Sequence, residues 1–144
     1  MESYKIRKIR IQDADRIGEI QEAVTKSSVK IDFKKILNEQ LRSDEDASFV
    51  ADLEGRVVGY MISYTFSGGF GLERSAWIAT LGVDPDFMGQ GIGKALAAEI
   101  LRVYEEKGIK NIFTSVPWDS VDLLSFFKTL GFDRSRFINL NINL

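Results

Sequence analysis

The chain has 144 residues, enough for one domain with a sizeable core, and its 19 Lys and Arg against 21 Asp and Glu give a formal net charge of −2. That balance is unlike the basic surface of a protein that binds nucleic acid, so we expect no nucleic-acid partner. The sequence contains no Cys and no His, which excludes disulfides, thiolate nucleophiles, His-dependent triads and metal sites with Cys or His ligands. No EF-hand spacing is present either, so we expect no metal.

The sequence shows no linker, repeat or membrane-spanning segment. Its apolar runs are far shorter than the roughly 18 residues that a membrane span needs, and its first residues lack the apolar core of a signal peptide. We therefore expect residues 1–144 to form a single cytoplasmic domain without a membrane partner.

The first half of the chain predicts two helices and a β-hairpin. Alternating apolar residues indicate a strand over 4–11, and Asp13 is suited to cap a helix that carries apolar residues at helical spacing. A second helix is expected over 32–42. The strands 48–53 and 57–65 follow, and Glu54-Gly55 between them is typical of a tight hairpin turn.

The second half predicts alternating strands and helices. A glycine-containing loop over 67–75 is either a surface connection or a lid over a substrate. After it we expect a buried strand at 76–83, a helix within 89–107 that Gly108 ends, a strand at 111–116, a helix at 120–130 that Gly131 ends, and a final strand at 137–144. This order predicts a mixed α/β (α+β) fold with an antiparallel meander in its middle.

The most informative segment is LGVDPDFMGQGIGKAL, residues 81–96. Gly89, Gly91 and Gly93 follow a buried strand and lead directly into an amphipathic helix, with Lys94 beside them. Glycines let the backbone approach a ligand closely, and the free amides of a helix's first turn attract anions. The segment therefore predicts a cradle for a phosphate or pyrophosphate.

Two familiar phosphate motifs do not fit this segment. In the P-loop pattern the first glycine falls on Met88 and the Ser/Thr falls on Ala95. In the dinucleotide pattern GxGxxG the third glycine falls on Lys94 or Leu96. A purely structural glycine loop is the remaining alternative.

The segment resembles the acyl-CoA loop of the GNAT superfamily of N-acetyltransferases, whose pattern is [RQ]xxGx[GA] after the fourth strand. Here it reads Met88-Gly89-Gln90-Gly91-Ile92-Gly93 after VDPDF, with Met88 in place of the usual Arg or Gln. The stretches IRKIRIQDADRIGEI, VVGYMI and LLSFFKTLGF also resemble family segments, so the resemblance spans nearly the whole chain. It implies a central mixed, mostly antiparallel sheet that is flanked by helices and splayed at the acyl-CoA site.

The resemblance also implies acetyl-CoA as co-substrate. Its pyrophosphate would lie on the amides of the loop, and its pantetheine arm would lie beside the fourth strand. The implied binding residues are Leu81, Gly82, Val83, Met88, Gly89, Gln90, Gly91, Ile92, Gly93, Lys94, Ser120 and Phe127. A backbone amide near Leu81 or Val83 would donate to the oxyanion of the reaction.

The acid and base side chains of the family are not found at their positions. The position of the usual Tyr acid holds Phe127, and the two usual positions of a Glu base hold Trp77 and Ser115. Glu73 is the best remaining carboxylate, and a solvated loop residue is its alternative interpretation. The catalytic acid and base therefore remain unassigned.

We expect an N-acyltransferase that moves an acetyl group to a primary amine, on a small molecule or a peptide N-terminus. The alternatives are a CoA-binding module without turnover and a structural protein whose loop is empty. Two further expectations concern surfaces. The C-terminal strand could pair with a second copy to make a homodimer, and an apolar acceptor pocket or, alternatively, core and dimer contacts would involve Phe66, Phe70, Leu72 and Trp77.

Overall fold

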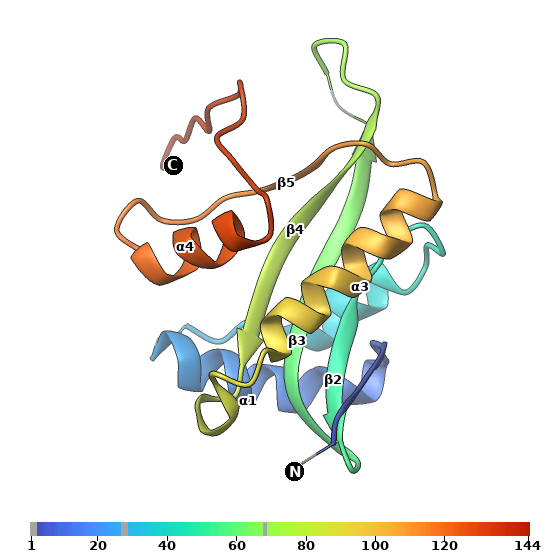
Figure 1. Cartoon of the computed structure of the whole chain (residues 1–144), viewed down its shortest axis with the longest axis vertical. Helices are drawn as coiled ribbons and strands as arrows, with labels where there is room; N and C mark the ends of the chain where they lie inside the picture. The colour runs from blue at the N-terminus through green and yellow to red at the C-terminus, as the bar shows by residue number, and fades with distance from the viewer. Residues whose placement is uncertain (1–2, 27–28, 68) are drawn as a thin grey trace.

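The computed structural model describes residues 3–26, 29–67 and 69–144. Its centre is a five-stranded sheet in the order β1-β2-β3-β4-β5 (Figure 1). The first four strands pair antiparallel with their neighbours, whereas β5 pairs parallel to β4. The expected mixed, mostly antiparallel sheet is confirmed, and its strands are β1 (Lys5–Lys8), β2 (Phe49–Leu53), β3 (Arg56–Ser67), β4 (Arg74–Val83) and β5 (Ile112–Thr114).

Helices cover both faces of the sheet. One face packs against α1 (Ala14–Thr25) and α2 (Phe33–Gln40), and the other against α3 (Ile92–Glu106) and α4 (Val121–Thr129). Alternation along β3 builds both cores, because Tyr60 and Ile62 lie in the core with α1 while Met61 lies in the core with α3. Two short 3-10 turns, Ile11–Asp13 and Pro85–Phe87, precede α1 and α3.

Turns and helix ends agree with the sequence analysis where glycine chemistry decides them. Glu54 and Gly55 both have positive φ, 50° and 93°, as a tight turn between β2 and β3 requires. Gly108 and Gly131 follow α3 and α4 with φ of 79° and 97°, the left-handed conformation that ends helices. The strand expected over 4–11 is shorter, because the chain leaves the sheet after Lys8.

The expected strand at 137–144 is wrong, since that segment has no strand in the structure. Alternation gives a strand one apolar face, but a strand also needs a neighbour that takes up its backbone hydrogen bonds. The tail contacts the chain through Phe137 against Phe113 and through a hydrogen bond from Asn139 to Ser115. Its apolar side chains are exposed, namely Ile138, Leu140, Ile142 and Leu144.

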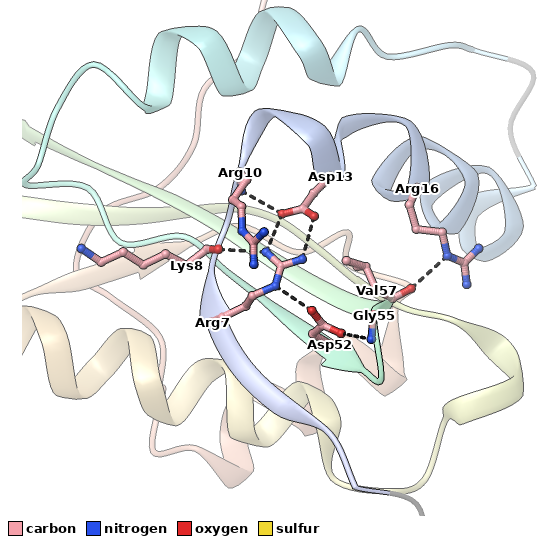
Figure 2. Close-up of polar contacts among 8 residues, drawn as sticks. All are labelled: Arg7, Lys8, Arg10, Asp13, Arg16, Asp52, Gly55 and Val57. Atoms are coloured by element: carbon pink, nitrogen blue, oxygen red, sulfur yellow. Dashed lines mark hydrogen bonds and ion pairs between the residues drawn. The ribbon is translucent and has the colours of Figure 1, made fainter.

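A buried ion-pair cluster joins β1 to the start of α1 and to the β2–β3 turn (Figure 2). The Arg7 Nε donates to Asp52 Oδ2 at 2.8 Å, and its two terminal nitrogens each donate to Asp13 at 2.9 Å. Asp52 also accepts from the amide of Gly55 at 2.7 Å. Asp13 is the N-cap residue of α1, as expected, but its side chain accepts from the Arg10 amide and makes no capping bond to the helix. The Asp13 carboxylate instead accepts hydrogen bonds from Arg7 within the cluster.

We expect Arg7→Gln to lower the free energy of unfolding by about 3–5 kcal/mol, because it leaves two buried carboxylates without their cation. Urea unfolding at pH 7 measures this change. The matched control is Arg102→Gln, whose ion pairs with Glu99 and Glu106 are on the surface of α3 and should contribute far less to stability. Equal losses in the two variants would contradict the role of the cluster.

The same cluster makes stability depend on pH. The hydrogen bond from Arg7 is the main cause that holds the pKa of Asp52 below its ordinary value of 3.8. Its contribution is therefore complete above that ordinary value and is lost as the pH falls through the lower folded-state pKa. Unfolding curves of Asp52→Asn should change less with pH on the acid side than those of the wild-type protein.

Candidate functional site

The sheet opens between β4 and β5. The two strands pair only from Ala76 to Ile78 on β4, and the Thr114 hydroxyl donates to the Ile78 carbonyl at 2.9 Å where the pairing ends. β4 continues to Val83, while β5 ends at Thr114. Within the described ranges, the last part of β4 therefore has a sheet partner on its β3 side alone.

A β-bulge lies at the point where the strands separate. Ile62 of β3 is opposite Thr80, but the next residue, Ser63, is opposite Ile78, so Ala79 is an extra residue on β4. Because one extra residue shifts the alternation of a strand, beyond the bulge each neighbouring strand is faced by the other set of backbone amides.

Two hydrogen bonds show this reversal. Before the bulge, the amide of Ala76 donates towards β5, to Asn111 O at 3.0 Å. After it, the amide of Asp84 donates towards β3, to Val58 O at 2.8 Å. Amides two residues apart on a strand point the same way, so those of Leu81 and Val83 point to the open edge.

The glycine loop lies at the end of this open edge. Gly89 and Gly91 adopt left-handed φ values of 81° and 77°, and a Cβ added to either would meet no atom within 4 Å. The first amide that donates within α3 is that of Ala95, to Gly91 O at 3.0 Å. The amides of Ile92, Gly93 and Lys94 precede it and so have no partner within the helix. This open, donor-rich cradle fits a pyrophosphate.

Two other glycines of the segment permit close packing. A Cβ on Gly82 would lie 2.8 Å from Cε1 of Tyr60, so the absence of a side chain lets that ring pass beneath β4. A Cβ on Gly93 would lie 3.3 Å from Cε1 of Phe126, so α4 packs against the first turn of α3. Gly82 and Gly93 thus fix the walls of the site.

Asp84 anchors the loop to α1. Burial by itself would raise the pKa of Asp84, but the Asp86 amide and the guanidinium of Arg16 hold it below its ordinary value. The carboxylate forms an ion pair with Arg16 of α1 and lies 3.8 Å from Arg56. Arg16 also donates to Val57 O at 2.9 Å (Figure 2). Together with its ion pair to Asp84, this bond joins α1, β3 and the loop.

Comparison with known proteins identifies the family of this chain. The profile of the acetyltransferase (GNAT) family matches residues 14–132. The chain belongs to the GNAT family. The mycothiol acetyltransferase of Amycolatopsis mediterranei is 35% identical over 94 residues, which are 63% of this chain and 31% of that protein. That of Saccharomonospora viridis is 32% identical over 110 residues, which are 72% of this chain and 36% of that protein.

The chain thus spans about a third of the length of these two curated relatives. Among solved structures, the aminoglycoside acetyltransferase meta-AAC0020 from an uncultured soil metagenomic sample, in complex with sisomicin, matches with a TM-score of 0.81 and 25% identity over 98% of this chain and 96% of that one. Aminoglycoside N-acetyltransferase AAC(6′)-Iy, in complex with CoA, matches with a TM-score of 0.82 over 99% and 96%, and its 17% identity shows the fold alone.

This GNAT chain departs from its family inside α4. Phe127, at the position of the usual Tyr, is 3% exposed and packs edge-on against Phe126 and Phe132, with ring centroids 5.2 and 5.1 Å apart. Its ring is part of the core. Ser120 lies at the N-cap of α4 and is partly exposed.

The candidate carboxylate lies away from the opening of the sheet. Glu73 is exposed and precedes the first residue of β4. It precedes Ile78 by five positions, which is about 17 Å along an extended chain. Ser115 is exposed directly after β5, and Trp77 is partly buried on β4. Phe127 has no group that could move a proton, and Glu73 is distant. Neither residue therefore supplies an acid or a base at the open edge.

Two absences hold for the described part of the chain. None of its helices is long and apolar enough to cross a membrane. Its acidic side chains form no cluster of three or more that could hold a metal ion.

We expect Gly91→Ala to weaken the binding of acetyl-CoA by about tenfold, because holding an alanine in the left-handed conformation of the cradle costs about 1–2 kcal/mol. Calorimetric titration measures the affinity. The control is Gly71→Ala, which has the same φ of 77° and equally open space but lies in the β3–β4 loop. Its affinity should equal that of the wild type, and an equal loss in both variants would contradict the assignment of the cradle.

Proposed function

We propose that the chain is an acetyl-CoA-dependent N-acetyltransferase that acts as one domain on a primary amine. The observation that carries this proposal is the position of the pyrophosphate cradle at the same end of β4 as the open edge. An anion held at the start of α3 places an attached, extended arm beside Leu81 and Val83. The named acetyltransferase relatives, and the CoA complex of AAC(6′)-Iy, support the assignment of the co-substrate.

The reaction that this geometry supports is direct acyl transfer. The lone pair of a neutral amine attacks the carbonyl carbon of the thioester, the C–N bond forms, and the carbonyl oxygen becomes an oxyanion. When the oxyanion collapses, the C–S bond breaks and the thiolate leaves. The nitrogen loses one proton and the thiolate gains one, so the step needs no other reactant. An amide of the open edge, that of Leu81 or Val83, is suited to stabilise the oxyanion.

Positioning supplies most of the rate in this proposal. Holding amine and thioester together can contribute about 7–11 kcal/mol, whereas a general acid or base contributes about 10²–10⁴ in rate. With Phe127 in the core and Glu73 distant, water carries the protons and turnover is slow. A chain that binds acetyl-CoA and never turns over would be a binding module, the second candidate that the lack of a placed acid favours.

A melting curve with acetyl-CoA tests the proposal first. A ligand at 100 times its Kd stabilises by about 2.7 kcal/mol, which is several degrees for a domain of this size. We expect acetyl-CoA to raise Tm, and ATP and NAD to leave it unchanged. Release of free thiol on addition of an amine then distinguishes an enzyme from a binding module, and no shift at millimolar acetyl-CoA would contradict both.

We further propose that the tail 137–144 pairs with a second copy of the chain. Its exposed apolar side chains alternate with Asn, as in a strand that lacks a neighbour, and β5 is an edge strand of the sheet. We expect a dimer in light scattering at micromolar concentration, and Leu140→Lys together with Ile142→Lys should make it a monomer. A monomeric wild-type protein would contradict this proposal and leave the acetyltransferase assignment intact.

A further inference from the structure

Five aromatic side chains gather on one face of the sheet, beside the open edge. Tyr64 of β3, Trp77 of β4 and Phe113 of β5 are neighbours across the strands. The ring of Phe66 lies 6.3 Å from that of Phe113, and the ring of Phe137 from the tail lies 6.0 Å from Phe113 on edge. We call this group the aromatic face; its members are Tyr64, Phe66, Trp77, Phe113 and Phe137.

The aromatic face lies on the side of α1 and α2. Ala76 and Ile78 point into the core with α3, so Trp77 between them points to the opposite side. On β3, Tyr60 and Ile62 are buried on that opposite side among residues of α1 and α2, whereas Tyr64, further along, is partly exposed. The β3–β4 hairpin runs beyond these helices (Figure 1), so they leave the aromatic face uncovered.

A small residue joins the rings into one surface. Ser75 is fully buried on β4 between Phe66 and Phe113, and its hydroxyl donates to the Glu73 carbonyl at 2.9 Å. With so small a side chain beneath them, rings from β3 and β5 come together across β4. All five members of the aromatic face are themselves partly exposed. The result is a group of partly exposed rings on one face of the sheet.

This surface begins where the sheet opens. Trp77 precedes Ile78, the last residue of β4 that pairs with β5. The cradle and the side chains of Leu81 and Val83 are on the α3 side of the sheet, and the aromatic face is on the other. A molecule that lies on the aromatic face can therefore present an amine to the open edge from the side opposite the co-substrate.

The charges near the aromatic face do not favour a polycation. None of the residues of β3, β4 and β5 is Asp or Glu, and two carboxylates that contact these strands already have partners: Asp46 accepts from Thr65, and Glu45 pairs with Arg74. The guanidinium of Arg136 lies 5.6 Å from the ring centroid of Phe137, so a positive charge already occupies one end. Four acidic residues line a groove of about 300 Å³ on α1 and the start of α2, namely Asp15, Glu19, Glu22 and Asp32, and that groove includes no member of the aromatic face.

We propose that the amine acceptor is a small primary amine with an aromatic ring or another large apolar group, and that the aromatic face binds that group. The proposal rests on the proposed acetyltransferase function. Stacked and edge-on rings recognise such a group through contact area and the ring quadrupoles, without charge. A polyhydroxylated polycation or a peptide N-terminus would find few partners on this surface.

Binding is tested separately from turnover by fluorescence. The chain has two tryptophans, and Trp118→Phe leaves Trp77 as the single reporter. In the presence of CoA, we expect 2-phenylethylamine to change the Trp77 emission with saturation, and ethanolamine at the same concentration to leave it unchanged. Equal responses to the two amines would overturn the proposal.

Turnover is tested with a panel of amines and acetyl-CoA, by thiol release. We expect kcat/KM for 2-phenylethylamine to exceed that for ethanolamine, sisomicin and an Ala-initiated peptide by about tenfold or more. Trp77→Leu should remove most of this preference and leave the KM for acetyl-CoA within about twofold of the wild type. The control is Phe70→Leu, a ring that is 95% exposed in the β3–β4 loop and should not affect the preference.

Different results would contradict the acetyltransferase function and the aromatic acceptor. If acetyl-CoA neither binds nor releases thiol, the acetyltransferase assignment fails. If thiol is released with sisomicin or the peptide as readily as with 2-phenylethylamine, the assignment stands and the aromatic acceptor is wrong. The same conclusion follows if Trp77→Leu keeps the substrate preference of the wild type, as the control Phe70→Leu should.

Discussion

The extra residue at Ala79 determines what the open edge of β4 can do. From Ala76 to Ile78, the backbone of β4 is paired on both sides, and the parallel partner then ends. Without the bulge, the alternation seen before Ile78 would continue, and the amides of Leu81 and Val83 would point towards β3. With the bulge, Leu81 and Val83 present their amides at a sheltered edge beside two cores. An open strand edge has backbone donors and acceptors without a sheet partner, so this edge is suited to pair with an extended ligand.

Two arginines hold α1 in place relative to this edge. Arg7 ties the start of α1 to the β2–β3 turn through Asp13 and Asp52, and Arg16 ties its first turns to Asp84 at the end of β4. Asp84 also accepts from the Asp86 amide, so the chain that leads to the cradle begins at a fixed point. Replacing such pairs by apolar residues can be neutral for stability, whereas removing one partner is costly. Their contribution here is to fix the register of α1 against the loop.

The parts of the site that sequence could predict are those whose signal is local. Gly89 and Gly91 indicated the cradle because glycines before a helix let the backbone approach an anion, and Glu54-Gly55 indicated the hairpin turn because glycine adopts left-handed φ without strain. The bulge gave no signal, since alanine is unremarkable in a strand and the register with β3 creates the irregularity. The Arg16–Asp84 pair joins residues 68 positions apart, and no local pattern encodes it. The tail shows the opposite failure, because its alternation is local but the neighbour that a strand requires is not.

The aromatic face offers a physical reason why the proposed reaction could proceed without a general base. Acyl transfer needs a neutral amine, and most primary amines are protonated at neutral pH. On a surface of rings with no carboxylate in the three strands beneath it, desolvation disfavours the ammonium form and lowers the pKa of a bound amine. Under the proposed function, a face built from Trp77 and its neighbours would shift the acceptor towards the reactive form, at the position where some members of the family carry a Glu. A polycation kept charged by carboxylates would gain nothing from such a surface. In the proposed function, Trp77 in place of a Glu removes a base and also favours an acceptor for which a base matters less.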